Sequence, residues 1–275
     1  MLAALGDMVE DIVVHLGGPI NEASDTLSQI VRRRGGSAAN VIETAAVLGY
    51  RARFLGQVGT DPIGAALIDE LGRSGADVSC VRRGGRSGTI IVLVDEQGER
   101  TMLTDRAACL DLSDPDRSWL TDVTTLHVPF YSFTHQPLAD TTTTLIGWAR
   151  ELGVRVSIDV SSVAVIEEIG QTRVIEMLEQ LRPDVVMANG DEAAALDITG
   201  PLAGAATVVK HGGDPVQVYV GSDRLTVTVP PIGNVADTTA AGDAFAAGYL
   251  TAGDVSAEMA VAAGCQAAAR LLTSR

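Results

Sequence analysis

Short apolar runs alternate with segments of helical periodicity along most of this chain. Strands are predicted at residues 2–5, 53–58, 125–128, 154–159, 184–188 and 207–210. Helices are predicted at residues 37–48, 62–74, 137–152, 172–181, 191–196, 241–252 and 256–272. Gly49, Gly75 and Gly153 directly follow three of these helices, where glycine commonly ends a helix. This alternation predicts a mainly parallel sheet covered by helices on both faces.

Two regions do not fit the alternation. Residues 10–16 with 26–33, and residues 88–95 with 99–104, have the pattern of antiparallel strand pairs joined by turns. We expect the two pairs to form one small sheet, made from about residues 10–34 and 87–105. Such a sheet would act as a lid over a site at the carboxyl ends of the parallel strands. No interdomain linker is evident, so residues 1–275 are predicted to form a single domain.

Composition narrows the functional classes. A chain of 275 residues that is 46% hydrophobic can bury a large core. Its net charge of −15 argues against nucleic acid or an anionic membrane as a partner. No apolar run reaches the ~20 residues of a membrane span, and the N-terminus lacks a signal-peptide pattern. We therefore expect a soluble, cytoplasmic protein. The spacing of Cys80, Cys109 and Cys265 fits no metal-ligand pattern.

The segment Asp-Thr-Thr-Ala-Ala-Gly-Asp, residues 237–243, is the most informative part of the chain. Its small residues open a predicted helix, where backbone N–H groups and the helix dipole favour an anion such as phosphate. A carboxylate at this place would repel that anion. Asp243 therefore indicates a base that takes a proton from the group attacking the phosphate.

Several segments together resemble the signatures of the ribokinase-like (PfkB-type) carbohydrate kinases. Residues 237–243 are similar to the second signature of that family, and Gly-Gly-Ser-Ala-Ala-Asn at 35–40 is similar to the first. Residues 56–64 and Asn-Gly-Asp-Glu at 189–192 add weaker matches. The resemblance implies a three-layer α/β/α sandwich with a mainly parallel central sheet and a small β-sheet lid. It also implies ATP-dependent phosphorylation of a primary hydroxyl on a sugar or sugar-like substrate.

The resemblance assigns roles on the acceptor side of the site. Asp243 would be the catalytic base, and the N–H groups of Ala241, Gly242 and Asp243 would stabilise charge on the transferred phosphoryl group. The implied substrate-binding residues are Asp11, Gly36, Asn40 and Arg106. Carboxylate and amide groups suit this task, because a carboxylate accepts hydroxyl hydrogen bonds and an amide both donates and accepts them.

On the nucleotide side, ATP is the implied co-substrate. The implied nucleotide-binding residues are Asn189, Glu192, Lys210, Gly212 and Gly242. Glu192 would hold Mg²⁺ through water, because Mg²⁺ prefers oxygen ligands and keeps several waters. In this family Asp237 and Thr239 often lie near a monovalent-cation site, which would take K⁺. By analogy, the lid is expected to form a homodimer contact.

Three departures from the family pattern keep alternatives open. Ala240 stands where the signature has its first glycine, and Asp-Val-Ser-Ser at 159–162 replaces an Asp-x-Asn-x-Arg motif. The chain also stops soon after Leu272, so closure of the adenine pocket is undetermined. A nucleoside kinase of the same fold and a sugar-binding protein that has lost transfer remain alternatives. A Rossmann oxidoreductase is the third and the least supported, because no Gly-x-Gly-x-x-Gly follows a strand.

Overall fold

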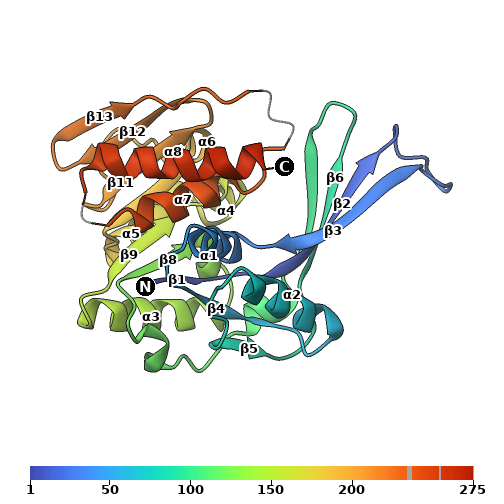
Figure 1. Cartoon of the computed structure of the whole chain (residues 1–275), viewed down its shortest axis with the longest axis horizontal. Helices are drawn as coiled ribbons and strands as arrows, with labels where there is room; N and C mark the ends of the chain where they lie inside the picture. The colour runs from blue at the N-terminus through green and yellow to red at the C-terminus, as the bar shows by residue number, and fades with distance from the viewer. Residues whose placement is uncertain (234–236, 254, 275) are drawn as a thin grey trace.

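The computed structural model describes residues 1–233, 237–253 and 255–274. Within them, nine strands form the main sheet in the order β13-β12-β11-β10-β9-β8-β1-β4-β5 (Figure 1). From β11 to β5 all neighbours are parallel, while β12 and β13 run antiparallel at one edge. The strand bounds are β1 Leu2–Leu5, β4 Ala52–Val58, β5 Val81–Arg83, β8 Thr125–Pro129, β9 Arg155–Asp159, β10 Val185–Asn189, β11 Ala206–His211, β12 Asp214–Val220 and β13 Asp223–Val227.

Helices cover both faces of this sheet. Their bounds are α1 Ser37–Val47, α2 Pro62–Arg73, α3 Leu138–Glu151, α4 Val163–Ile169, α5 Gln171–Leu181, α6 Gly190–Ala195, α7 Ala241–Thr251 and α8 Ala257–Thr273. The buried residues of α3, α4, α5 and α6 share one apolar cluster, and those of α1, α2, α7 and α8 share another. Successive residues of β1 point into different clusters, Ala4 into the second and Leu5 into the first. The predicted three-layer sandwich is thus confirmed.

A second, smaller sheet projects from one side of the main body (Figure 1). It contains β2 Val9–Leu16, β3 Ser28–Gly35, β6 Thr89–Val94 and β7 Arg100–Asp105, in the order β3-β2-β6-β7. The two predicted hairpin-like pairs are antiparallel, and β2 joins them by pairing with β6 in parallel. Every residue of β7 is exposed, so this edge strand adds nothing to the buried core.

The predicted elements are all present, and their ends lie within two residues of the prediction. The sequence analysis did not predict β5, β12, β13 or α4. The seven residues of α4 include Val163, Val165 and Ile166, whose β-branched side chains lower helix propensity. The strand β5 has only three residues. In the described part of the chain, no helix is long and apolar enough to cross a membrane.

Candidate active site

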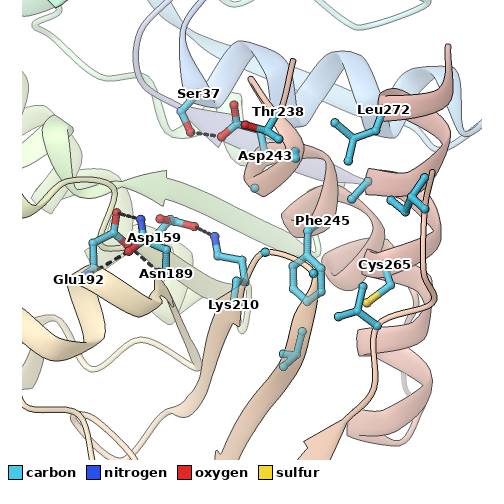
Figure 2. Close-up of a pocket in the computed structure, with 18 of the residues that line it drawn as sticks. Ser37, Asp159, Asn189, Glu192, Lys210, Thr238, Asp243, Phe245, Cys265 and Leu272 are labelled. Atoms are coloured by element: carbon cyan, nitrogen blue, oxygen red, sulfur yellow. Dashed lines mark hydrogen bonds and ion pairs between the residues drawn. The ribbon is translucent and has the colours of Figure 1, made fainter. Parts of the chain in front are cut away.

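A cavity of about 690 Å³ runs along the carboxyl ends of the parallel strands, between them and helices α7 and α8 (Figure 2). Its polar end is lined by Ser37, Asp159, Asn189, Glu192, Lys210 and Asp243. Its apolar end is lined by Val216, Val229, Phe245, Cys265, Ala268 and Leu272. The last residues of β9 and β10, Asp159 and Asn189, reach this cavity because parallel strands present their carboxyl ends at one sheet edge.

Helix α7 points its N-terminus at the polar end of the cavity. Ala240, the residue before the helix, has φ 62° and ψ 9°, which is the left-handed region that favours glycine. The N–H of Ala241 donates to the carbonyl of Thr238 over 3.2 Å. The N–H groups that open a helix have no partner inside it, so those of Gly242 and Asp243 can donate to a ligand. Of the three predicted charge-stabilising N–H groups, Ala241 thus already has a partner in this structure.

The carboxylate of Asp243 is fixed by two donors from the first turn of α1. The Ser37 hydroxyl donates to Oδ1 over 2.6 Å (Figure 2). The Asn40 amide donates to Oδ2 over 2.8 Å. Burial raises the pKa of Asp243, while these two hydrogen bonds oppose the rise. A fixed carboxylate with a raised pKa is suited to accept a proton.

The Asp11 carboxylate lies at the base of the second sheet, facing Gly35. Its Oδ1 is buried and has no hydrogen-bond partner within the described part of the chain, and burial raises the pKa of this carboxyl. An ideal Cβ at residue 35 would lie 2.2 Å from that Oδ1, so glycine leaves the room that the carboxylate fills. Gly36 has φ 102°, and a Cβ there would lie 2.2 Å from the carbonyl oxygen of Asp7. The glycine pair thus lets the β3–α1 turn pack closely beside Asp11.

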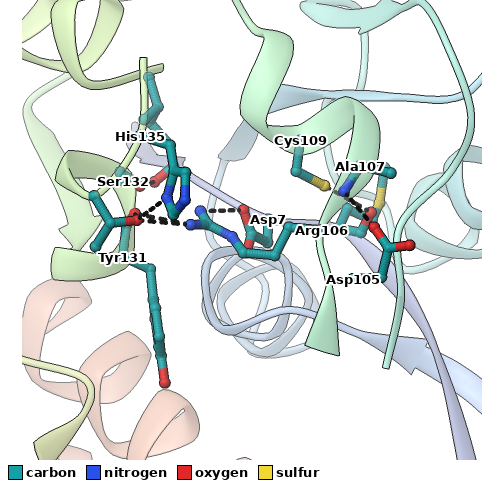
Figure 3. A network of polar contacts seen from close by, with 11 residues as sticks. Asp7, Asp105, Arg106, Ala107, Cys109, Tyr131, Ser132 and His135 are labelled. Atoms are coloured by element: carbon teal, nitrogen blue, oxygen red, sulfur yellow. Dashed lines mark hydrogen bonds and ion pairs between the residues drawn. The ribbon is translucent and has the colours of Figure 1, made fainter. Parts of the chain in front are cut away.

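Arg106 is held by its surroundings rather than free for a ligand (Figure 3). Its Nε and Nη2 donate to both oxygens of Asp7 over 2.6 and 2.8 Å. Its Nη1 donates to the carbonyl of Tyr131 over 3.1 Å and to the hydroxyl of Thr134 over 3.0 Å. A guanidinium has five N–H groups. One therefore remains for the predicted contact with substrate, and the main role visible here is to brace the loop after β1 against residues 131–134.

Four side chains, Asp159, Asn189, Glu192 and Lys210, meet at the polar end of the cavity (Figure 2). Lys210 Nζ lies 2.7 Å from Asp159 Oδ2, and although burial lowers the pKa of Lys210, the Asp159 carboxylate more than offsets this and raises it. Glu192 accepts from the backbone and side-chain amides of Asn189, each over 2.8 Å. Burial, and then the charge of Asp159, raise the pKa of Glu192 to about 7. A Cβ at Gly242 would lie 3.6 Å from Lys210 Nζ, so this ammonium sits beside the start of α7.

Asp237 and Thr239, the predicted monovalent-cation residues, contact two arginines of the second sheet. Arg33 of β3 donates to Asp237 Oδ2 over 3.1 Å and to the Thr239 hydroxyl over 3.4 Å. Arg100 of β7 donates to Asp237 Oδ1 over 2.6 Å and also to the Thr239 hydroxyl. Burial raises the pKa of Asp237, but hydrogen bonds from Thr239 and both arginines hold it well below its usual range.

The sequence profile of the pfkB family carbohydrate kinases matches residues 1–275. The chain belongs to this family. Among curated relatives, an ATP-dependent ribose-1-phosphate kinase of Halopiger xanaduensis is 30% identical over 247 residues, covering 85% of this chain and 79% of the relative. A fructokinase of Salmonella typhimurium is 28% identical over 263 residues, covering 90% and 82%. The protein is thus an ATP-dependent kinase of sugar-like substrates, as the resemblance implied, and neither the nucleoside kinase nor the impaired sugar-binding protein is favoured.

Solved structures of PfkB-like folds superpose closely on this one. An adenosine kinase from Sinorhizobium meliloti has a TM-score of 0.86 at 23% identity, covering 99% of this chain and 93% of its own. A sugar kinase from Pyrococcus horikoshii in complex with ATP also has a TM-score of 0.86, at 20% identity, covering 100% and 93%. At these identities the likeness establishes the ribokinase-like fold.

Four residues of this PfkB site were not predicted from the sequence. Ser37, Asp159 and Tyr131 line the cavity, with the guanidinium of Arg106 5.7 Å from the centre of the Tyr131 ring, and Arg34 donates to Asn40. A signal existed for Ser37, because it lies three residues before Asn40 and helical residues at that spacing share a face. Asp159 was noted only as a departure from a motif. No local pattern marks Tyr131 or Arg34.

Proposed function

We propose that Asp243 is the base that accepts a proton from a primary hydroxyl of the sugar while that oxygen attacks the γ-phosphorus of ATP. The observation that carries this proposal is the fixed Asp243 carboxylate at the N-terminus of α7, with Ser37 and Asn40 as donors. Asp243 lies in the first turn of α7, so the proton acceptor is next to the N–H groups that would stabilise negative charge on the phosphoryl group.

The sugar would bind between the start of α1 and the second sheet. The unpartnered Oδ1 of Asp11 supports this, since a buried carboxylate oxygen without a donor is matched by a hydroxyl hydrogen. Gly36 has no side chain, so the sugar could approach the backbone closely there. Asn40 places an amide next to the Asp243 carboxylate. Arg106 contributes at most one N–H and otherwise holds Asp7 in place.

ATP would lie along the cavity, with its phosphates at the polar end. The N–H groups of Gly242 and Asp243, with Ala241 once its bond to Thr238 is released, and the ammonium of Lys210 supply positive charge there. Gly212 and Asn189 line the same wall. The adenine would occupy the apolar end, which is lined by Leu272 of α8 and the Pro230–Pro231 segment.

The donor set at the polar end suits Mg²⁺. Glu192 and Asp159 offer carboxylate oxygens, and the raised pKa of Glu192 reflects a buried acid that a cation would favour in its ionised form. In residues 1–233, 237–253 and 255–274 no group of three or more His, Cys, Asp or Glu could hold a metal alone. Mg²⁺ fits such a site because it is usually held by one or two carboxylates, phosphates and water. When bound, it neutralises charge on the phosphates.

For the monovalent cation we propose a correction to the family's pattern. Two guanidinium groups already neutralise Asp237, so a K⁺ ion at this carboxylate would be repelled by Arg33 and Arg100. Arg33 and Arg100 would supply the positive charge that K⁺ would supply in relatives. Because both come from the second sheet, their contacts also hold it over the site, where it would act as a lid that limits ATP hydrolysis by water.

The proton and charge movements follow from these positions. The hydroxyl proton passes to Asp243 as the oxygen–phosphorus bond forms in line with the bond that breaks, and ADP leaves. Helix α7 and Lys210 stabilise the charge on the transferred group.

Location in the cytoplasm and a homodimer through the second sheet remain predictions. The exposed Ile30, Met102 and Leu103 on that sheet support the dimer.

The experiment that tests the proposal is an assay of ADP release. The purified chain with Mg·ATP would be offered sugars, sugar phosphates and nucleosides in parallel. Turnover with a sugar or sugar phosphate supports the proposal, while turnover confined to nucleosides would move the substrate class to the alternative. Binding of a sugar by calorimetry without ADP release under any nucleotide would favour the impaired protein instead.

A further inference from the structure

Arg34 is a buried cation one contact away from the base. It is the last residue before the glycine pair at the end of β3, and its side chain is only 2% exposed. Its Nη1 donates to Asn40 Oδ1 over 3.1 Å, and its Nη2 donates to Glu43 Oε2 over 2.5 Å. Asn40 in turn donates to Asp243 over 2.8 Å. A continuous chain of hydrogen bonds therefore runs from Glu43 through Arg34 and Asn40 to Asp243.

The chemistry of these groups allows only one orientation of the Asn40 amide. A guanidinium has donors and no acceptor, while an ionised carboxylate has acceptors and no donor. The amide must therefore turn its oxygen to Arg34 and its NH₂ to Asp243. If it flipped by 180°, its NH₂ would face a cation and its oxygen would face an anion, and both contacts would be repulsive.

We propose that Arg34 is a positioning residue for phosphoryl transfer: it fixes the Asn40 amide so that its NH₂ holds the Asp243 carboxylate in place. This inference rests on the proposed role of Asp243 as the base. Arg34 does not line the cavity, and it reaches the base through Asn40. Its charge also acts on Asp11, where it opposes the rise in the pKa of that carboxyl. Glu43, whose side chain is 38% exposed, anchors the other edge of the guanidinium and offsets its charge.

A simpler interpretation is that Arg34 and Glu43 form an ion pair that fastens β3 to α1. Two features favour the positioning role. The pair is asymmetric, since the cation is almost completely buried while its carboxylate partner is partly in solvent. Burying an arginine is costly, and its Nε has no hydrogen-bond partner in the described part of the chain, so the ion pair does not fully offset that cost. One of the two nitrogens that do donate is directed at an amide that faces the base.

The test compares Arg34→Met with Asn40→Ala, the double variant and a control. Arg32→Gln is the control, because Arg32 lies two residues away on the same strand, has a side chain that is 67% exposed, and pairs with Glu10 over 3.5 Å. If Arg34 acts through Asn40, Arg34→Met lowers kcat at least tenfold with the KM for ATP unchanged. The double variant then loses no more than Asn40→Ala alone, because the two residues act as one unit. Arg32→Gln keeps kcat within twofold.

The pH profile separates positioning from simple stability. The charged and hydrogen-bonding groups facing Asp243 are Ser37 and Asn40 on α1, Asp159 on β9 and Lys210 on β11. Loss of the Asn40 hydrogen bond removes a contact that lowers the pKa of Asp243, so the acidic limb of the kcat profile moves to higher pH in Arg34→Met and Asn40→Ala alike. A merely structural role would lower the melting temperature and leave this limb in place.

A measurement without turnover keeps this inference separate from the assignment of the base. The carboxyl pKa of Asp243, followed by ¹³C NMR in the intact chain, should rise in Arg34→Met by the same amount as in Asn40→Ala. If wild type shows no kinase activity, the proposed function fails while this shift still reports on Arg34. An unchanged Asp243 pKa in Arg34→Met, or losses of kcat that multiply in the double variant, would overturn the role of Arg34.

Discussion

The Asp11 carboxylate fills the space that a side chain at Gly35 would need, with its Oδ1 2.2 Å from an ideal Cβ at that residue. The same Oδ1 is buried and has no partner within the described part of the chain. A site that leaves a carboxylate oxygen unpartnered is less stable on its own and binds a hydroxyl more tightly. The role of Asp11 in binding the sugar can therefore be tested by changing Gly35, with Asp243 left unchanged.

Gly35→Ala should displace Asp11 and raise the KM for the sugar roughly tenfold to a hundredfold, the range for a hydrogen bond to a charged group. The KM for ATP should not change, because the cavity that would hold ATP is not lined by either residue. The double variant Gly35→Ala/Asp11→Ala should recover the melting temperature but not the sugar affinity. Steady-state kinetics and thermal melts measure both. A Gly35→Ala enzyme with wild-type KM for sugar would contradict the role of Asp11.

Ala240→Gly should leave the stability unchanged or raise it slightly. Ala240 sits at φ 62°, where a side chain costs about 1–2 kcal/mol, while a new glycine adds about 0.4–1 kcal/mol of unfolded-state entropy. Ala262 is a matched control, since it is an exposed alanine inside α8 and its change to glycine should lose roughly 1 kcal/mol. Denaturant unfolding measures both variants. An Ala240→Gly protein destabilised as much as Ala262→Gly would show that no backbone strain exists at residue 240.

The contacts of Asp237 with Arg33 and Arg100 predict a kinase that does not need K⁺. Replacing K⁺ by Na⁺ or choline at constant ionic strength should change kcat less than twofold. The double variant Arg33→Gln/Arg100→Gln should lose activity and regain part of it with K⁺, because the Asp237 carboxylate would then lack its cations. Arg32→Gln again serves as the exposed control. Strong K⁺ activation of the wild-type enzyme would refute this assignment.

The raised pKa of Glu192 predicts that the stability of the fold depends on pH. Its folded-state pKa of about 7 lies above its ordinary value of 4.5, so the folded chain holds this proton more tightly than the unfolded chain. The contribution of Glu192 to the free energy of unfolding is fully present below pH 4.5, and it is lost as the pH rises through 7. Glu192→Gln should therefore raise the melting temperature relative to wild type more at pH 8 than at pH 5. Glu168→Gln, an exposed change on α4, should show no such difference. An equal effect of Glu192→Gln at both pH values would contradict the raised pKa.

The layers of the fold were predictable because each signal is local. Apolar runs, helical periodicity and stop glycines mark elements within a few residues, and the antiparallel pairs of the second sheet follow from alternation and a turn. The alternating valines of β12, Val216, Val218 and Val220, carry the same kind of signal, although that strand was not predicted. The short, β-branched α4 has no strong signal.

The contacts inside the site were less predictable, because they join residues far apart in the chain. Asp237 meets Arg33 and Arg100 across 204 and 137 residues, and Lys210 meets Asp159 across 51. Motif spacing identifies which residues gather at the sheet edge but not which charges pair there. Arg106 illustrates the difference: a position expected to face substrate is instead mostly saturated by Asp7, Tyr131 and Thr134.

The most direct test of the account is the rate of ADP formation by Asp243→Asn with Mg·ATP and the best sugar substrate of the wild type. Asparagine keeps the size of the side chain but cannot take the proton, so the account predicts a fall in kcat of roughly 10²–10⁴-fold with ATP affinity retained. Asp140→Asn, an exposed change on α3, should keep full activity. Turnover by Asp243→Asn within tenfold of wild type would contradict the assignment of Asp243 as the base.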